Sequence, residues 1–484
     1  MVTDILKTYA QASGQSINLE KSSVYFSSNT PNSQKEEIKQ ILGVRKVDRF
    51  ESYLGLPTLV GRSKYQSFSY LKDRVWKKLQ GWKGMLLSRA GKEILIKAVA
   101  QSIPTYTMGV FQLPMKLCDE LDALCAKFWW GQVGNKRKIH WRRWDRLATP
   151  KKEGGIGFRD LRASNLAMLA KQGWRLLQDD ESLLYKCFKA RYFPQSNLLE
   201  AIVSPNCSFV WRSIMAALPI LKNGCCWRVG NGYSIRVHED RWIPNHPTNK
   251  VLYPASEETD GMLVVDLLDP DLQCWRRELI TSVFHTDDVK AICRIPLSHR
   301  HVPNLLVWMY NKNGLFSVKS AYRVAMQIQK GEEWAENSSG CAGKQVWNAL
   351  WKLHIPNKIK VFGWRACQEI LPTRLNLAKR QIIHDNICPN CTKFPKSTHA
   401  LWDYGVAVDV WAGSALKLQK CAHGQADMIE LMEYLLSRLS VQKMELFLVQ
   451  AWIIWGKASR SKHVMQKSCG VPGGISEFSR KFVC

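Results

Sequence analysis

Apolar residues at helical spacing between about residue 60 and residue 190 limit, more than any other feature, what this chain can fold into. Phe68, Leu71, Val75, Leu79 and Trp82 recur every three or four positions, which places them on one face of a helix. Serine and proline residues suited to N-caps and first turns precede the stripes that follow. Such stripes pack into cores, so this part of the chain is predicted to be helical.

Beyond residue 200 the pattern changes to mixed helix and strand. Residues 226–229 and 233–237 alternate on either side of the turn signal at 230–232, Gly-Asn-Gly, which predicts a β-hairpin. Another strand is predicted at 315–318. The low-hydropathy stretch 331–344 is the predicted linker. Helical patterns fill much of the remainder, the last two at 428–439 and 444–459.

The charge of the chain points to a polyanionic partner. Its 484 residues include 69 Lys and Arg against 41 Asp and Glu, a formal net charge of +28 that is spread along the sequence. In a chain with 46% hydrophobic residues, which can bury several cores, such an excess favours RNA or DNA as the partner. A cationic surface kept for solubility is the alternative.

Part of this charge lies on the polar faces of two consecutive predicted helices. A phosphate-facing surface there would bind through contacts that release counterions and carry little sequence information. Binding to RNA or DNA is therefore expected to be salt-sensitive and sequence-nonspecific. The predicted contact residues in this region are Lys72, Arg74, Lys77, Lys78, Lys83, Arg89, Lys92 and Lys97.

Paired carboxylates are the residues that template copying would need, because two metal ions must be held at the tip of a β-hairpin. Asp179-Asp180 follows a helical pattern and Asp287-Asp288 precedes another. Neither pair is predicted to lie on a strand, and both are interpreted as solvated charges at helix ends. The sequence also contains no Gly-rich phosphate loop, nucleophile elbow or HExxH motif. No catalytic residue is predicted.

One constellation has metal-ligand character. Cys388 and Cys391 form a CxxC knuckle, and His399 follows eight residues later, which can supply three ligands of a structural zinc site. The fourth ligand is not evident: Tyr404 is a poor zinc ligand, and Cys421 or His423 would require the chain to fold back. Zinc is therefore a candidate cofactor at an incomplete site.

The cysteines and the hydropathy of the chain indicate the cellular compartment. Fifteen scattered Cys do not follow the spacing of a secreted disulfide framework and are interpreted as reduced thiols. No apolar signal segment follows Met1, and the longest apolar stretches are shorter than the roughly 20 residues that span a membrane. An intracellular protein, nuclear or cytoplasmic and without a membrane partner, is expected.

Several motifs resemble those of plant LINE-type (non-LTR) retrotransposon reverse transcriptases. The run 12–22, ASGQSINLEKS, is similar to the segment after their catalytic Asp-Asp hairpin, and 53–57, YLGLP, resembles their primer-contacting turn. The motif FSVKSAY at 316–322 resembles the start of their zinc-binding domain. The resemblance covers about residues 1–460 and includes the thumb-like motifs LQGWK at 79–83, LSRAGK at 87–92 and GGIGFRD at 154–160.

The resemblance implies roles for particular residues. It makes Lys21 the counterpart of the lysine near the incoming nucleotide, and Cys388, Cys391 and His399 the zinc ligands. Family members carry Cys where this chain has Tyr404. The resemblance also implies that the Asp-Asp hairpin would lie upstream of Met1, and the residues after Ser459 do not supply the carboxylates of an RNase H domain.

Together these observations predict an α+β fold that is predominantly helical, with a truncated palm remnant, a helical thumb-like region, a mixed α/β segment and a small zinc-binding-like helical domain. The predicted function is that of a truncated retroelement polyprotein which binds nucleic acid without polymerase or RNase H activity. Two alternatives stay open: a polymerase component active only when complemented by the missing catalytic part, and a domesticated protein-interaction adaptor. The predicted segments are 1–60, 61–195, 196–330, 345–415 and 416–484.

Overall fold

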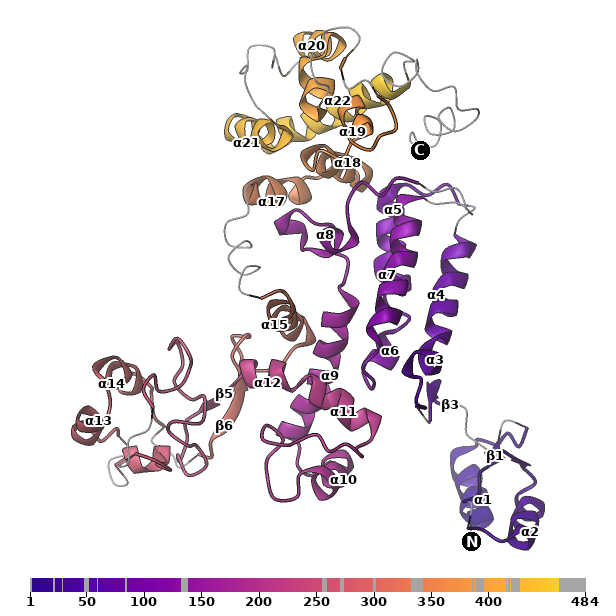
Figure 1. Cartoon of the computed structure of the whole chain (residues 1–484), viewed down its shortest axis with the longest axis vertical. Coiled ribbons are helices and arrows are strands. Elements are labelled where there is room, and N and C mark those ends of the chain that lie inside the picture. Colours follow the sequence, from indigo (N-terminus) through magenta and orange to yellow (C-terminus); the bar gives the residue numbers. More distant parts are fainter. Residues whose placement is uncertain are drawn as a thin grey trace. The chain divides into compact units, whose positions relative to one another are not determined.

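Helices dominate the computed structural model, and its strands are few and short, which confirms the predicted predominantly helical α+β class (Figure 1). The chain forms two compact units, Met1–Tyr70 and Leu71–Cys484. The finer division into five segments stays a prediction. The structure describes residues 2–20, 22–27, 29–47, 52–58, 60–82, 85–131, 138–254, 259–269, 274–298, 302–331, 343–384, 387–388, 396–414, 416, 418 and 427–460.

Unit 1 consists of short helices and two pairs of two-residue strands. Its elements are α1 (Val2–Ser13), β1 (Ser23–Val24), α2 (Asn32–Leu42), β2 (Arg45–Lys46), β3 (Ser52–Tyr53), β4 (Leu56–Pro57) and α3 (Lys64–Phe68). The parallel pair β1–β2 flanks α2, and the antiparallel pair β3–β4 is closed by Leu54 and Gly55 at positive φ, 50° and 79°. The glycine fits this turn because it adopts positive φ at little cost.

The first 58 residues enclose no core in the part that is described. None of the side chains described between residues 3 and 58 is buried. Ile5, Ile41 and Leu54 are 60%, 60% and 72% exposed. Burial of apolar surface is the main contribution that stabilises a fold, and these side chains do not provide it. The stability of this segment therefore depends on its short-range hydrogen bonds or on a partner that covers it.

Unit 2 begins with the predicted helices. They are α4 (Tyr70–Gly81), α5 (Arg89–Leu95), the π-helix η1 (Ile96–Ala100), α6 (Thr105–Met108), α7 (Met115–Trp130), α8 (Trp144–Ala148), the 3₁₀ turn η2 (Lys151–Glu153), α9 (Leu161–Gln178), α10 (Leu183–Tyr192), α11 (Phe209–Ala216) and α12 (Leu218–Gly224). Ser88 caps α5 as predicted, its Oγ accepting from Gly91 N at 3.2 Å. The predicted apolar stripe of α4 is buried at Leu71, Val75 and Leu79.

The main core of unit 2 lies where α9 packs against α12 and α15 (Val318–Lys330). Trp308 is fully buried there and stands against Trp174 and Phe316, with ring centroids 6.1 and 4.7 Å away. Gly224 permits this packing, because a Cβ at that position would lie 2.1 Å from the Trp308 ring. The position of this tryptophan is therefore fixed from several sides.

The predicted hairpin across 230–232 is wrong. β5 (Cys225–Arg228) pairs instead with β6 (Leu305–Trp308), antiparallel and distant in sequence. The N–H groups of Gly230 and Gly232 donate to Asn304 Oδ1 at 2.9 and 3.0 Å, so the turn residues are held by a side chain beside β6. The strand predicted at 315–318 does not form either, because Val318 already begins α15 and Ser317 caps it.

A second, smaller core fills the region between β5 and β6 in the sequence. It gathers buried residues such as Ile235, Trp242 and Trp275 around the 3₁₀ turn η3 (Val264–Leu267) and the helices α13 (Arg277–Val283) and α14 (Thr286–Ile292). The indole N–H of Trp242 donates to Val237 O at 2.8 Å, which satisfies a buried donor.

The C-terminal helices of unit 2 contain the segment with the candidate zinc ligands. They are α17 (Lys344–Lys352), α18 (Asn357–Cys367), α19 (Arg374–Ala378), the π-helix η4 (His399–Asp403), α20 (Gly405–Ala412), α21 (Met428–Arg438) and α22 (Val441–Arg460). The last two confirm the helices predicted there. Trp364 Nε1 and Gln368 Nε2 both donate to Gly154 O at 2.8 Å, which joins α18 to the end of η2. The predicted linker lies mostly outside the described residues.

The described helices include no candidate membrane span. None of them combines the length and the apolar composition that a bilayer crossing requires.

Candidate nucleic-acid interface and zinc-binding segment

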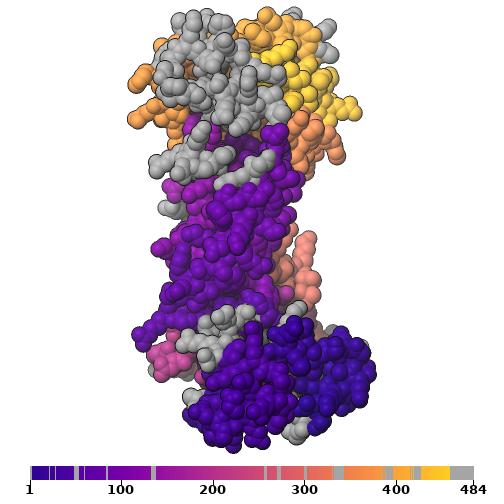
Figure 2. Space-filling model, turned by 90° about the vertical axis from the view of Figure 1, so that its right-hand side faces the viewer, coloured from indigo at the N-terminus to yellow at the C-terminus, as the bar shows by residue number. Residues whose placement is uncertain are grey.

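Three of the predicted nucleic-acid contacts lie together on the outer side of α4. Arg74, Lys77 and Lys78 are exposed, whereas Leu71, Val75 and Leu79 of the same helix are buried. A helix turns 100° per residue, so these three side chains share one sector of its surface. We call them the α4 basic face. Figure 2 shows the violet part of the chain that contains α4 forming the surface toward the viewer.

Lys72 belongs to the same helix but is engaged. Its Nζ lies 2.8 Å from Glu120 Oε2 on α7, which links the two helices that run side by side in Figure 1. Trp82 and Phe128 also meet between these helices, with ring centroids 5.9 Å apart. The ion pair and the ring contact hold α4 against α7. Lys72 therefore helps to position the α4 basic face and is not counted as one of its members.

Arg89 and Lys92 point into unit 2. The Arg89 guanidinium donates to Trp129 O at 3.1 Å and lies 5.0 Å from the centroid of Trp130. Burial lowers its pKa to about 10. Burial, and then the charge of Arg89, lower the pKa of Lys92 to about 8, and Lys92 Nζ lies 5.5 Å from the Phe128 ring. Both cations contribute to packing through cation–π contacts.

Lys97 is part of an internal charge cluster. Its Nζ donates to Glu93 Oε1 at 2.7 Å and to Ile156 O at 2.6 Å, and Lys151 Nζ lies 2.8 Å from the same carboxylate oxygen. Burial lowers the pKa of Lys97, and the negative charge of Glu93 opposes that shift. Lys97 thus joins η1 to the segment after η2. Two further predicted contacts, Lys21 and Lys83, lie outside the described residues.

The acidic pairs considered in the sequence lie at helix ends, as predicted. Asp179 is the C-cap residue of α9, and its Oδ1 accepts from Ser182 N at 3.1 Å. Asp288 in the first turn of α14 is not solvated, in contrast to the prediction: it is fully buried, lies 3.2 Å from His246 Nε2 and accepts from Leu252 N. The carboxylates of Asp179 and Asp288 therefore both have partners within the fold.

Asp122 on α7 is a buried carboxyl group that sequence reasoning missed. Burial, and then the charge of Asp160, raise its pKa from the ordinary value of 3.8 to about 8. Its Oδ1 is buried, and a hydrogen bond from the Trp144 side chain opposes part of the shift in pKa. A carboxyl group in this setting favours the neutral form.

The Asp122→Asn variant is expected to unfold less readily than the wild type at pH 8.5. Because the folded pKa is raised, Asp122 contributes stability that is fully present below about pH 4 and is lost as the pH rises through about 8. The whole shift corresponds to about 6 kcal/mol, which solvent screening reduces to about 2–3 kcal/mol. Urea unfolding at pH 4.5 and 8.5 measures this, and an advantage of the variant that does not grow with pH would contradict it.

The candidate zinc ligands are only partly described. Cys388 is buried, His399 is buried at the start of η4, and Cys391 lies outside the described residues. Tyr404 follows η4, and its ring centroid lies 6.1 Å from that of His399. Within the described part of the chain, no three His, Cys, Asp or Glu side chains gather as a metal site. With a phenol after η4, these residues do not complete a closed tetrahedral site.

A carboxylate holds this segment in place by other means. Glu369 Oε2 accepts from Ser397 N at 3.0 Å, and Glu369 Oε1 accepts from Met428 N at 3.4 Å. Ser397 is fully buried and precedes His399, while Met428 begins α21. The Glu369 side chain therefore connects the residues before η4 to the start of α21. In a separate contact, Trp411 of α20 stacks on Phe447 of α22, with ring centroids 5.1 Å apart.

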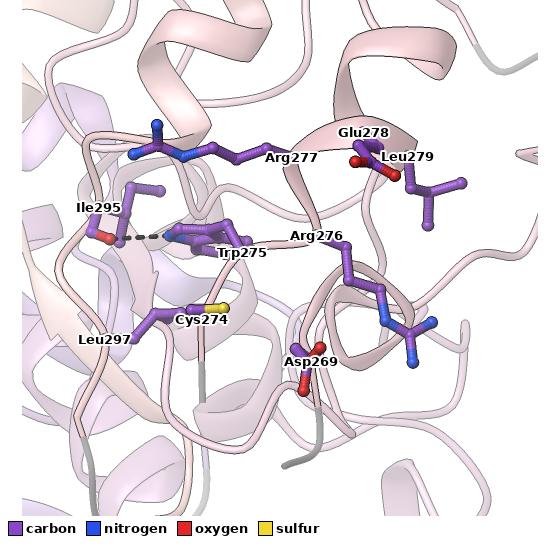
Figure 3. Close-up of a pocket in the computed structure, with 9 residues that line it drawn as sticks. All are labelled: Asp269, Cys274, Trp275, Arg276, Arg277, Glu278, Leu279, Ile295 and Leu297. Atoms are coloured by element: carbon purple, nitrogen blue, oxygen red, sulfur yellow. Dashed lines mark hydrogen bonds between the residues drawn. The ribbon is translucent and has the colours of Figure 1, made fainter. Parts of the chain in front are cut away.

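A pocket in the smaller core region is shown in Figure 3 and has a volume of about 680 Å³. Arg276 and Arg277 extend away from each other around Trp275, whose indole N–H donates to Ile295 O at 2.9 Å. Asp269 and Glu278 line the same pocket. Its two cations are balanced by two carboxylates, so the lining of the pocket carries no net positive charge.

Comparison with known proteins places residues 316–411 in the family described as zinc-binding in reverse transcriptase. A protein of Arabidopsis thaliana provisionally named a ribonuclease H protein is 31% identical over 366 residues, which are 74% of this chain and 57% of that protein. An uncharacterised mitochondrial protein of Arabidopsis thaliana is 40% identical over 143 residues, 29% of this chain and 93% of that protein. The chain thus spans little more than half the length of the first relative.

Proposed function

The chain belongs to the family of plant retrotransposon-derived proteins that carry the zinc-binding domain of reverse transcriptases, and we propose that it binds RNA or DNA without sequence preference through the α4 basic face. The observation that carries the proposal is the exposure of Arg74, Lys77 and Lys78 on a helix that Lys72 and Glu120 hold against α7. Exposed cations on a fixed helix can contact phosphates and release counterions. The net charge of +28 supports the same partner.

In this proposal the chain has no polymerase or RNase H activity of its own. One residue of each acidic pair is engaged otherwise, since Asp179 Oδ1 accepts from Ser182 N and Asp288 lies 3.2 Å from His246 Nε2. Zinc, if retained, would be held by Cys388, Cys391 and His399 with one ligand short of a structural site, and it would order the segment rather than take part in a reaction.

Neutralising the α4 basic face is expected to lower the salt dependence of binding. In a variant carrying Arg74→Gln, Lys77→Gln and Lys78→Gln, the slope of log K against log salt should fall by about 2–3, because each lost phosphate contact contributes about 0.7–0.9. Fluorescence anisotropy with a labelled RNA and a labelled DNA across a salt series measures the slope.

A charge-matched control separates this face from net charge alone. Arg276→Gln, Arg277→Gln and Arg294→Gln remove the same charge from exposed positions near α13 and α14. This control should leave the slope within about one unit of the wild-type value. Equal losses in both variants, or no binding by the wild type at low salt, would overturn the proposed function.

A second candidate function is favoured by unit 1. The exposed apolar side chains Ile5, Ile41 and Leu54, in a segment without a described buried side chain, suit a surface that another polypeptide covers. This would fit a polymerase component that works only when a separate chain supplies the catalytic carboxylates. Primer extension on adding an upstream palm fragment, and none with either part alone, would establish it.

A further inference from the structure

A cleft of about 1000 Å³ lies between the two cores of unit 2, beside β5 and β6. One wall comes from the end of α9, from α10 and from the turn 193–200, and the opposite wall comes from the segment 234–250 of the smaller core. Trp227 of β5 lines it and packs against both cores. We call it the β5 cleft. Its volume is at the upper end of the range for small-molecule sites.

Arg241 is a fixed cation in the β5 cleft. Its Nη1 donates to Lys222 O at 2.7 Å, and its Nε donates to Thr248 O at 3.2 Å. Both acceptors are neutral carbonyl oxygens, and no carboxylate of the described residues forms an ion pair with Arg241 or with the exposed Lys222, which also lines the cleft. A guanidinium has five N–H donors, so these bonds orient Arg241 and leave it donors for an anion.

The carboxylates of the β5 cleft do not balance this charge. Glu239 pairs with Arg236, and Asp240 Oδ2 accepts from Arg236 N at 2.8 Å. Asp180 and Glu200 are exposed and make no ion pair within the described part of the chain. A carboxylate only accepts hydrogen bonds, so these two suit a ligand that brings hydroxyl or amine donors.

Aromatic and apolar side chains form the rest of the lining. Phe193 and Leu198 are each 2% exposed, and the rings of Trp227 and Tyr185 are partly exposed. Trp227 is also joined to the fixed cation, because its backbone N–H donates to Arg241 O at 2.7 Å. The β5 cleft therefore places a flat apolar face beside a guanidinium.

A nucleoside phosphate matches each part of this lining. Its phosphate is an anion for the guanidinium, its base has a flat face that stacks on an aromatic ring, and its ribose hydroxyls donate to carboxylates. A nucleoside without phosphate matches the ring but not the cation. A sugar phosphate matches the cation but not the ring.

We propose that the β5 cleft binds a free nucleoside monophosphate, with the phosphate at Arg241 and Lys222 and the base against Trp227. The site lies on other elements than α4 and does not rest on the proposed function. The end of a nucleic-acid strand can carry the same phosphate, and the test separates these two sources.

Isothermal titration calorimetry of the full chain with adenosine monophosphate tests the proposal. The wild type should bind it about tenfold more tightly than adenosine, which lacks the phosphate, and about tenfold more tightly than ribose phosphate, which lacks the base. A 5′-phosphorylated dinucleotide should bind more weakly than the monophosphate. A dinucleotide that binds as tightly would overturn the free ligand and assign the site to strand ends.

Two variants and a matched control locate the phosphate. Arg241→Gln should weaken binding of adenosine monophosphate about tenfold. Because Arg241 also holds two carbonyl groups, Lys222→Gln is the second variant, and at this exposed position it should lower affinity severalfold without loss of the fold. Arg175→Gln removes the same charge from an exposed position on α9 outside the cleft and should change affinity less than twofold. Circular dichroism confirms that each variant is folded.

Three results would overturn the β5 cleft as the site. They are no binding of adenosine monophosphate by the wild type, equal affinity for ribose phosphate, and equal losses in Arg241→Gln and Arg175→Gln. The variant with Arg74→Gln, Lys77→Gln and Lys78→Gln should keep its affinity for adenosine monophosphate, and a loss there would place the nucleotide on the α4 basic face instead. The proposed function has its own test in the salt slope and stands or falls separately.

Discussion

The Tyr404→Cys variant should bind zinc about a hundredfold more tightly than the wild type. Structural zinc sites are closed by four Cys or His ligands, and this segment offers Cys388, Cys391 and His399 with a phenol after η4. A structural zinc ion contributes about 10–16 kcal/mol, or about 3 kcal/mol per ligand if divided equally, which corresponds to about a hundredfold in affinity. Competition against a chromogenic chelator measures the difference.

The matched control for this variant is Tyr404→Ser, which has nearly the size of cysteine but no thiolate. It should bind zinc no better than the wild type, because relief of crowding alone supplies no fourth ligand. If Tyr404→Ser and Tyr404→Cys gain equally, or if neither gains, the assignment of Cys388, Cys391 and His399 as one site is wrong. Zinc content by mass spectrometry of the purified proteins checks the same point at equilibrium.

The Trp308→Ala variant should lose about 3–5 kcal/mol of unfolding free energy, the usual cost of truncating a buried tryptophan. Trp308 is fully buried between Trp174 and Phe316, and its Nε1 donates to Ser320 Oγ at 2.8 Å. Its removal leaves a cavity where β6, α9 and α15 meet and takes one hydrogen-bond donor from the Ser320 hydroxyl. Urea unfolding followed by circular dichroism at 222 nm gives the value.

Two other variants bracket the Trp308 result. Trp308→Phe keeps most of the ring volume and loses the hydrogen bond to Ser320, so its cost should be about 1–2 kcal/mol. Trp76→Ala, at a half-exposed position, should cost less than about 0.5 kcal/mol. A loss below about 1 kcal/mol for Trp308→Ala would mean that this core can collapse around the gap, contrary to the close contact with Gly224.

Local signals were sufficient to predict the helices. The spacing of Leu71, Val75 and Leu79, and the cap at Ser88, depend on residues one to four positions apart, and the structure confirms them. The hairpin at 230–232 failed for the opposite reason. β5 finds its partner in β6, and Asn304 takes the turn's N–H groups, so the outcome was decided by a segment that no local pattern links to it.

For the candidate site, too, the sequence predicts what depends on local spacing and not what depends on contacts distant in sequence. Arg74, Lys77 and Lys78 follow directly from the sequence of α4, because helical spacing leaves them outside the buried stripe. Lys97 has the same sequence signature but donates to Ile156 O, and Arg89 donates to Trp129 O. A local pattern shows that a side chain is cationic and lies outside the apolar stripe. It does not show which carbonyl group or aromatic ring, distant in sequence, that side chain contacts in the fold.

Glu369 bears on how the C-terminal segment can change over evolutionary time. Its carboxylate joins the N–H groups of Ser397 and Met428, and so performs a cross-linking task of the kind that a metal ion performs in a zinc domain. Where such a tether exists, selection for the fold no longer acts on every ligand position. A lineage can then lose a ligand by drift, keep the shape of the domain, and regain the metal by a single codon change.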